Sequence, residues 1–296
     1  MKLLGRIPFI VSMVIFGTIG LFVRGIALPS SEIALFRALL AILLLGAVML
    51  FRKRRISLCS LGREGVLLFL SGAAMGFNWI LLFEAYKHTT VSVATLCYYF
   101  APVLVTILSP VIFKERLTVR GIVSFVGATV GIVLITGLGD VGGERGFSGI
   151  LLGLGAATLY ATVILLNKGI ERIGGIERTF LQFISAAVVL LPYVIFTSGF
   201  SVGSLDPKGV LLLITVGILH TGLAYIMYFS SLSSLGGQEA AILSYIDPLV
   251  ALLCSVAFLE EPLAPAVIVG AVLILGFTLL SEIDFKKIFA KKSSED

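Results

Sequence analysis

Ten apolar runs of about 18 to 25 residues recur along this chain, each long enough to cross the hydrocarbon core of a bilayer as a helix. Backbone polar groups in lipid must be satisfied within their own segment, so such runs are expected to be helical. The chain is 58% hydrophobic and 13% charged, outside the range of soluble globular domains. The sequence therefore predicts an all-α integral membrane protein.

We place ten transmembrane helices between short polar loops. The predicted ranges are 7–23, 32–51, 65–86, 91–113, 119–136, 149–168, 176–198, 208–230, 237–259 and 264–281. Lys2 and Arg6 ahead of the first span are also typical of a signal peptide. No small-residue cleavage pattern follows them, so we expect this span to stay in the mature protein.

An internal repeat joins two parts of the chain, because residues 66–118 and 212–264 align without a gap at a fixed offset of 146 residues. The coinciding pairs include Gly76 and Gly222, Phe83 and Phe229, Ala94 and Ala240, Tyr99 and Tyr245, Pro102 and Pro248, Ser109 and Ser255, and Glu115 and Glu261. Such repeats are typical of secondary transporters, whose binding sites lie where the halves meet near the midplane. We predict two five-helix repeats, residues 1–145 and 146–296, joined by a glycine-rich loop.

Five spans in each half is an odd number, so the second repeat is expected to be inverted relative to the first. Seventeen of the 22 Lys and Arg residues fall in segments that lie inside when the N-terminus is cytoplasmic. The positive-inside rule therefore predicts that both termini are cytoplasmic, with Glu115 on the inner side and Glu261 on the outer side. This topology accounts for the basic character of the chain, and no nucleic-acid partner is expected.

Residues suited to covalent or metal chemistry are sparse. The cysteines Cys59, Cys97 and Cys254 have neither a disulfide framework nor a metal-binding spacing. The histidines His88 and His220 stand alone, and no HExxH or GxSxG motif occurs. We predict no metal and no cofactor, and an intramembrane enzyme is only a remote alternative.

A polar stripe marks the fourth span, because hydroxyl groups recur there at helical steps on an otherwise apolar helix. The stripe comprises Ser92, Thr95, Tyr99 and Thr106. In the repeat, Gln238 matches Ser92 and Tyr245 matches Tyr99, so two stripes are expected to face each other in the bundle interior. We predict a cavity lined by Thr95, Tyr99, Gln238 and Tyr245. The alternative for the hydroxyl groups is a bond to their own helix.

Three more polar residues, Asn78, His220 and Asp247, lie at membrane depth. An intramembrane carboxylate is a functional candidate, and Asp247 is expected to hold a substrate amine, carry a coupling proton or cap a broken helix. His220 is a candidate because imidazole titrates near neutral pH, although a lone helical histidine is also compatible with packing. Asn78 is expected to face the cavity, since an amide in lipid needs partners.

Aromatic residues accompany these polar groups on the third and eighth spans. Trp79 matches Tyr225 in the repeat. An aromatic cage beside a carboxylate suits an ammonium group, and packing of the bundle is the alternative. We therefore include Trp79 and Tyr225 among the candidate substrate-binding residues.

Arg37 and Glu84 are the charges near the outer ends of the second and third spans. Each would cost roughly 2.5 to 3.5 kcal/mol if left unpaired in lipid. The matching positions in the second half are Gln182 and Ser230, so both charges are absent together. We predict an ion pair between Arg37 and Glu84 that acts as a structural link or outer gate; in the alternative, Glu84 meets a cationic substrate group or a proton.

Pro102 and Pro248 lie in the middle of the fourth and ninth spans. Proline removes one backbone hydrogen bond and clashes with the preceding turn, so both helices are expected to kink. The carbonyls that are freed must find other partners in lipid. We predict hinges at these prolines, and simple curvature for packing is the alternative.

These residues resemble the drug/metabolite transporter superfamily, in its ten-helix EamA-type branch. The resemblance rests on Phe36 and Arg37, Asn78, Trp79, Ala85, Tyr86, Thr89, Thr90, Tyr99, Ala101, Pro102, the turn Glu115 to Thr118, and in the second half Tyr245, Asp247, Pro248, Glu261 and Pro262. It covers nearly the whole chain and is specific for the fold. It implies a substrate cavity between the third, fourth, eighth and ninth helices that opens to either side in turn.

From these observations we expect a multi-pass protein of the bacterial cell membrane that transports a small polar metabolite, an amino acid or an amine, by secondary active transport and alternating access. Export is the direction that the resemblance implies. A coupling proton and a homodimer are possible partners besides the substrate and the lipid bilayer. A channel or a facilitative permease without ion coupling is the alternative.

Overall fold

The structure is a computed structural model that describes residues 2–53, 62–114, 117–138, 143–232, 234–235 and 237–282. Its helices are α1 (Lys2–Arg24), α2 (Ser30–Phe51), α3 (Gly62–His88), α4 (Val91–Tyr98), α5 (Ala101–Phe113), α6 (Val119–Leu138), α7 (Gly143–Asn167), α8 (Gly175–Thr197), η2 (Val202–Ser204), α9 (Pro207–Thr215), η3 (Val216–Leu223), α10 (Ala224–Leu232), α11 (Gly237–Ser244), α12 (Ile246–Phe258) and α13 (Pro265–Glu282). Here η2 is a 3₁₀ turn and η3 is a π-helix.

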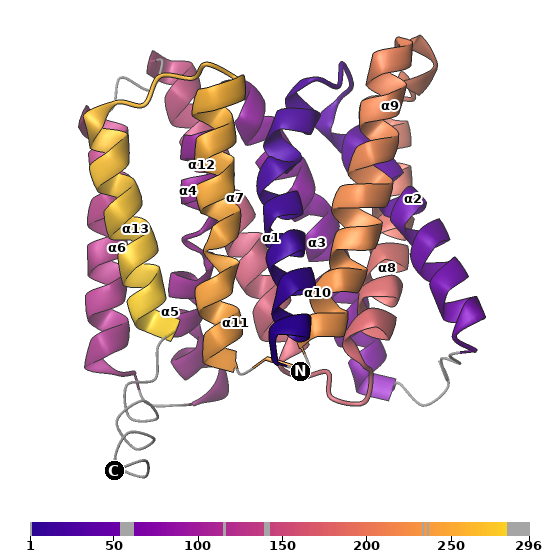
Figure 1. Cartoon of the computed structure of the whole chain (residues 1–296), viewed down its shortest axis with the longest axis horizontal. Coiled ribbons are helices and arrows are strands. Elements are labelled where there is room, and N and C mark those ends of the chain that lie inside the picture. The colour runs from indigo at the N-terminus through magenta and orange to yellow at the C-terminus, as the bar shows by residue number, and fades with distance from the viewer. Residues whose placement is uncertain are drawn as a thin grey trace.

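Apolar helices long enough to span a membrane dominate the described residues. Nine helical stretches meet the length and composition that a crossing requires, and Ile242–Phe258 is a shorter apolar helix. The helices lie side by side in one bundle, and the start of α1 and the end of α13 lie at the same end of it (Figure 1). The predicted all-α membrane bundle is confirmed at this level.

The two halves of the chain exchange contacts instead of packing as separate bodies. The first helix, α1, packs against α10 and α12 of the second half, and α7 packs against α3, α4 and α5 of the first half. The helix α2 contacts α8 and η3, and α3 contacts α8 in turn. Each half therefore completes the packing of the other.

One contact between the halves brings two backbones together. Helices α6 and α13 lie against each other at one edge of the bundle (Figure 1). A Cβ atom built on Gly131 would lie 2.9 Å from the carbonyl oxygen of Gly270, and one built on Gly270 would lie 2.8 Å from that of Gly131. Small residues permit this close approach, which is the usual basis of helix association in lipid.

The fourth and ninth spans, predicted as continuous helices, are both interrupted. The fourth is divided at Tyr99 and Phe100 into α4 and α5, and the ninth at Tyr245 into α11 and α12. Pro102 and Pro248 fall in the first turn of the second piece in each case, where a missing N–H costs least. At the predicted kinks, both spans are divided into two helices, and the division lies just ahead of each proline.

The backbone repeats a rare conformation at the far ends of these two spans. Lys114 and Glu260 both have positive φ values, 56° and 53°, and stand 146 residues apart, as the repeat requires. Few residues other than glycine adopt this left-handed conformation. The two spans thus share both their breaks and their endings.

We expect the close contact between α6 and α13 to be needed for stability. Leucine at position 270 would overlap the backbone of α6, so the substitution Gly270→Leu should destabilise the fold by at least about 1 to 3 kcal/mol. The measurement is thermal unfolding of the purified protein in detergent. The control is Gly276→Leu on the same helix, because a Cβ at Gly276 meets nothing within 4 Å. Equal melting temperatures for the two variants would contradict this account.

Candidate functional site

The two broken helices meet at their breaks. The hydroxyl of Tyr99, between α4 and α5, donates a hydrogen bond to Oδ2 of Asp247 on α12 at 2.8 Å. The rings of Tyr99 and Tyr245 lie with their centroids 6.3 Å apart. The structure therefore brings together three of the predicted site residues, one from the first half and two from the second.

Pro248 explains why a polar side chain is needed at this point. Proline has no N–H, so Pro248 cannot donate the usual helical hydrogen bond to the carbonyl of Ser244, four residues earlier. The Tyr99 hydroxyl lies 3.2 Å from this carbonyl oxygen as well as near Asp247. A backbone group freed in lipid must be satisfied by neighbours, and here the other half of the chain supplies one.

Tyrosines from both halves surround the meeting point. The ring of Tyr98 on α4 stacks on Tyr160 of α7 at 5.1 Å, and the hydroxyl of Tyr86 lies 3.4 Å from Oγ1 of Thr95. Tyr98, Tyr160 and Asp247 all remain partly exposed although their helices face one another within the bundle. We call the partly exposed group Tyr98, Tyr99, Tyr160, Tyr225, Tyr245 and Asp247 the tyrosine site.

Arg37 lies on α2 and is almost fully buried, with 3% exposure. Its Nε donates to Oγ1 of Thr221 at 2.9 Å, and the guanidinium lies 4.1 Å from the ring centroid of Trp79 and 5.2 Å from that of Phe83. Cations are attracted to aromatic faces, which offsets part of the cost of burial. No carboxylate among the described residues forms an ion pair with Arg37.

The predicted ion pair between Arg37 and Glu84 is therefore wrong for this structure. Glu84 instead accepts from Ser30 at 2.7 Å and pairs with Lys87 and His88 on its own helix, at 3.3 and 3.4 Å. The reason is helical geometry. Trp79 and Phe83 stand four residues apart on the face of α3 that meets Arg37, whereas Glu84 is rotated by about 100° from Phe83.

Two predicted cavity residues take part in packing. Nδ2 of Asn78 donates to the carbonyl of Ala156 on α7 at 2.6 Å, in a buried position. His220 has no exposed surface, and its ring nitrogens lie 3.0 Å from Oγ1 of Thr18 and 3.3 Å from the carbonyl of Thr215. Neither side chain reaches the tyrosine site, in agreement with the alternative of packing for His220.

The predicted aromatic pair is held apart by a third ring. Phe183 on α8 lies edge-on to both Trp79 and Tyr225, with centroids 5.4 and 5.3 Å away. Trp79 is buried, while Tyr225 stays partly exposed. Gln238 is the second residue of α11, but its side chain lies outside the described part of the chain, as does Glu115. No cage between Trp79 and Tyr225 is formed.

An ionic network that the sequence did not predict ties one end of the bundle together. Arg24 at the end of α1 pairs with Glu261 at 2.5 Å and donates to the carbonyls of Tyr86 and Thr89 at 2.8 and 3.0 Å. The second carboxylate oxygen of Glu261 accepts from the backbone N–H of Val91, the first residue of α4, at 2.9 Å. We call this the Arg24–Glu261 lock.

The sequence held a signal for this lock. Arg24 is one of the few basic residues on the predicted outer side, and Glu261 is predicted in an outer loop. An arginine and a glutamate in short loops on the same sparse side are natural partners. The pairing of Arg37 with Glu84 rests instead on their position near the outer ends of two spans and on the absence of both charges from the second half. The third partner, a backbone N–H at a helix start, was visible only in the structure.

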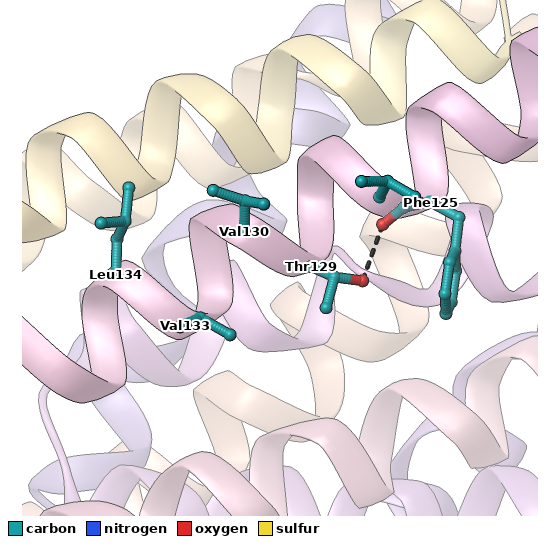
Figure 2. A pocket seen from close by; sticks show the side chains of 6 residues that line it. Phe125, Thr129, Val130, Val133 and Leu134 are labelled. Carbon is teal, nitrogen blue, oxygen red and sulfur yellow. Dashed lines mark hydrogen bonds between the residues drawn. The ribbon is translucent and has the colours of Figure 1, made fainter.

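A groove of about 250 Å³ on α6 lies away from all these residues. Figure 2 shows its lining, with Phe125, Thr129, Val130, Val133 and Leu134 labelled. Val130 and Val133 are exposed on the outer surface, and Oγ1 of Thr129 donates to the carbonyl of Phe125 in its own helix at 2.7 Å. An apolar groove with no available polar group suits lipid chains and offers nothing to orient a polar molecule.

Comparison with known proteins agrees with this architecture. The EamA-like transporter family matches the chain twice, over residues 3–137 and 147–282. A solved crystal structure superposes with a TM-score of 0.64 at 18% identity, covering 94% of this chain and 97% of that one. At that identity the superposition shows the fold alone.

Several curated relatives are similar to this chain, and two of them are named as transporters. The uncharacterized transporter YxxF of Bacillus subtilis (strain 168) is 32% identical over 254 residues, which cover 85% of this chain and 81% of that protein. An uncharacterized transporter of Archaeoglobus fulgidus is 28% identical over 281 residues, 94% of this chain and 96% of its own. Protein PecM of Dickeya dadantii (strain 3937) is 28% identical over 219 residues, 72% of either chain. With two matches to the family over a bundle of apolar helices, this chain is a multi-pass membrane transporter and belongs to the EamA-like transporter family.

Proposed function

We propose that this protein is a secondary transporter of the cell membrane that moves a small polar metabolite, an amino acid or an amine, through the tyrosine site by alternating access. The observation that carries the proposal is the hydrogen bond between Tyr99 and Asp247. It joins two broken helices from opposite halves at the depth of their breaks. Discontinuous helices that meet at a repeat interface are the usual construction of a transporter site.

Inversion of the two halves is part of the proposal. The exchange of α1 and α7 between the halves, the paired breaks at Tyr99 and Tyr245, and the two family matches all support a duplicated unit. An odd number of spans in each unit then requires opposite orientation in the membrane. The repeat boundary near residue 145 and the cytoplasmic termini follow from the same argument and from the positive-inside rule.

The breaks supply the hinges in this mechanism. Few backbone hydrogen bonds hold a chain at an interrupted helix, so α4 and α11 can reorient relative to α5 and α12. The Tyr99 hydroxyl would then donate its hydrogen bond to a polar group of the substrate instead of to Asp247. Export as the direction of transport rests on the family resemblance.

The Arg24–Glu261 lock replaces the predicted Arg37–Glu84 pair as the outer gate in this proposal. It joins α1, α3, the start of α4 and the loop after α12, which come from both halves. Opening that end requires Glu261 to release Arg24 and the N–H of Val91. At the other end, Lys168 donates to Ser109, the residue that matches Ser255, and Ser255 itself donates to Glu261.

Transport should depend on the contact between the broken helices. In proteoliposomes, Tyr99→Phe and Asp247→Asn should each lower the exchange of a labelled compound by roughly 10-fold or more, since each removes a charge-assisted hydrogen bond. The double variant should lose little beyond Asp247→Asn alone, because the residues act together. Tyr193→Phe on the outside of α8 is the control.

The compound for this assay comes from a thermal-shift screen of amino acids, amines and nucleosides against the purified protein, because a ligand of the folded state raises its stability. Exchange must also be accelerated by unlabelled compound on the opposite side. Flux without such acceleration would favour the channel alternative. Strictly additive losses in the double variant would refute the role of the Tyr99 contact.

The inverted arrangement predicts where two equivalent residues label. Lys114 and Glu260 match in the repeat and are both exposed. In a variant without native cysteines, Lys114→Cys should react with an impermeant maleimide only after the membrane is opened, and Glu260→Cys should react in intact cells. Labelling of both from one side would rule out inversion.

Weakening the Arg24–Glu261 lock should expose the site from the outer side. A cysteine introduced as Tyr98→Cys in the cysteine-free chain reports the accessibility of the tyrosine site to an impermeant maleimide. Adding Glu261→Gln should accelerate the labelling roughly 10-fold or more, because one charge-assisted contact is lost from the closed state alone. Glu260→Gln, the adjacent exposed residue, is the matched control. No difference between the two variants would remove the lock from the mechanism.

A further inference from the structure

The eighth span contains a π-helix, η3, where its repeat counterpart is a regular α-helix. A π-helix joins each N–H to the carbonyl five residues earlier, one residue more than an α-helix, and the N–H of Ala224 donates to the carbonyl of Leu219 in this way. The matching residues 70–77 lie within the continuous helix α3. The repeat aligns the two segments without a gap, so no inserted residue accounts for the difference.

Two glycines of η3 lie directly against the neighbouring helix α2. A Cβ atom built on Gly217 would lie 2.5 Å from the side chain of Leu40, and one built on Gly222 would lie 2.6 Å from that of Leu44. The glycines stand five residues apart, whereas the leucines stand four residues apart on one face of an α-helix. The packing against α2 therefore fits the longer step of the π-helix.

The first half shows the same contact with an α-helical step. Gly72 and Gly76 of α3 stand four residues apart, and a Cβ on either would crowd α8, the counterpart of α2. At the repeat offset of 146 residues, Gly76 matches Gly222, but Gly72 matches Ile218 and not the glycine before it. The shift of one glycine by one residue is a sequence signal for the π-helix.

Buried side chains stabilise the π-helix through its own carbonyls. Nε of Arg37 donates to Oγ1 of Thr221 at 2.9 Å, and this hydroxyl donates to the carbonyl of Val216 at 2.8 Å, five residues earlier. Nδ1 of His220 lies 3.3 Å from the carbonyl of Thr215, also five residues earlier. In an α-helix, residues five apart are rotated by about 140° from each other, so neither contact could form there.

The form of η3 sets the direction of the side chains in α10. If η3 became an α-helix with the same number of residues, it would need about one residue less for the same turn, and α10 would rotate by about 100°. Tyr225 of the tyrosine site now meets Phe16 and Phe183, with ring centroids 5.1 and 5.3 Å away. After the rotation, Ala224, which now has no exposed surface, would take the place of Tyr225.

We infer that Arg37 and Thr221 are positioning residues, which hold η3 in its π-helical form and thereby turn Tyr225 toward the tyrosine site. The inference rests on the proposed function for the role of Tyr225 in transport. It gives the buried Arg37 a role that needs no contact with the substrate. π-helical turns are rare and occur frequently at functional sites, which agrees with a local device of this kind.

The test measures the rotation of α10 directly. In the full chain without native cysteines, Tyr225→Cys and Ala224→Cys are made separately, and the rate of reaction with N-ethylmaleimide is measured on the purified protein. The cysteine at position 225 should react faster than the one at 224. Adding Thr221→Val, which keeps the shape of the side chain and removes its hydrogen bonds, should reverse this order. The ratio of the two rates should change about 10-fold or more, as expected from the loss of a hydrogen bond to a charged group.

Thr215→Val is the matched control, because the hydroxyl of Thr215 donates to the carbonyl of Leu211 within α9 and should leave the ratio unchanged. Deleting Leu219 from the Thr221→Val variant removes the extra residue, so the faster reaction should return to position 225. This rescue is specific to rotation, because a general loss of packing would not be repaired by a deletion.

A second variant reaches the same end without changing Arg37 or Thr221. Gly217→Ile combined with Ile218→Gly sets the two glycines of η3 four residues apart, as in α3. We expect the α-helical form and faster reaction at position 224. The melting temperature shows whether each variant folds, and either variant serves if the other does not.

The outcomes separate this inference from the proposed function, because the labelling needs no substrate. An unchanged order of reactivity in Thr221→Val would overturn the role of Arg37 and Thr221, even if the exchange of the two glycine positions altered it. An unchanged order in both variants would also overturn the link between η3 and Tyr225. Absence of exchange for every compound tested would refute the proposed function and leave the labelling result as it stands.

Discussion

The fold depends on one constraint: at membrane depth, every backbone polar group must find its partner within the protein. Continuous helices meet this constraint alone, but the fourth and ninth spans do not. Pro248 offers no N–H to the carbonyl of Ser244, and the hydroxyl of Tyr99 from the other half donates to that carbonyl. The break in the ninth span is therefore stabilised by a contact between the two halves of the chain. The same hydroxyl group also donates to Asp247, which places a carboxylate at the breaks.

Charges within the bundle differ in the partners that the fold gives them. Arg24 and Glu261 neutralise each other where the helices end, and Glu84 is surrounded by Ser30, Lys87 and His88. Among the described residues, Arg37 and Asp247 form no ion pair and contact aromatic rings and hydroxyl groups instead. A charge buried at membrane depth costs free energy, which polar and aromatic contacts offset in part.

Much of the site could be predicted because the repeat aligned the residues that the fold later joined. Tyr99 and Tyr245 coincide at the offset of 146 residues, and both lie at a helix break in contact with each other. The predictions for Arg37, Glu84 and Asn78 are wrong because position along a span does not give the distance between side chains of different helices. Arg37 and Glu84 are predicted at a similar depth in the membrane, but Glu84 does not lie on the face of α3 that meets Arg37. Asn78 donates its amide hydrogen bond to the carbonyl of Ala156 on α7 and does not face the tyrosine site. The depth of a residue in the membrane follows from its position along the span. The direction of its side chain depends on how the helix is rotated against its neighbours.

The sequence by itself determined the number and length of the apolar segments, their duplication and the positions of the two breaks, because these depend on local hydrophobicity and on the missing N–H of proline. Only the tertiary structure decided which charges pair. Glu261 finds Arg24 and the N–H of Val91, which stand 237 and 170 residues away along the chain. Arg37 contacts Trp79 and Thr221, and the predicted partner Glu84 contacts Ser30, Lys87 and His88. A hydrogen-bonded ion pair needs its donor and acceptor within about 3 Å of each other. Which charges pair is therefore set by the rotation and register of packed helices, which the pattern of a single helix does not contain.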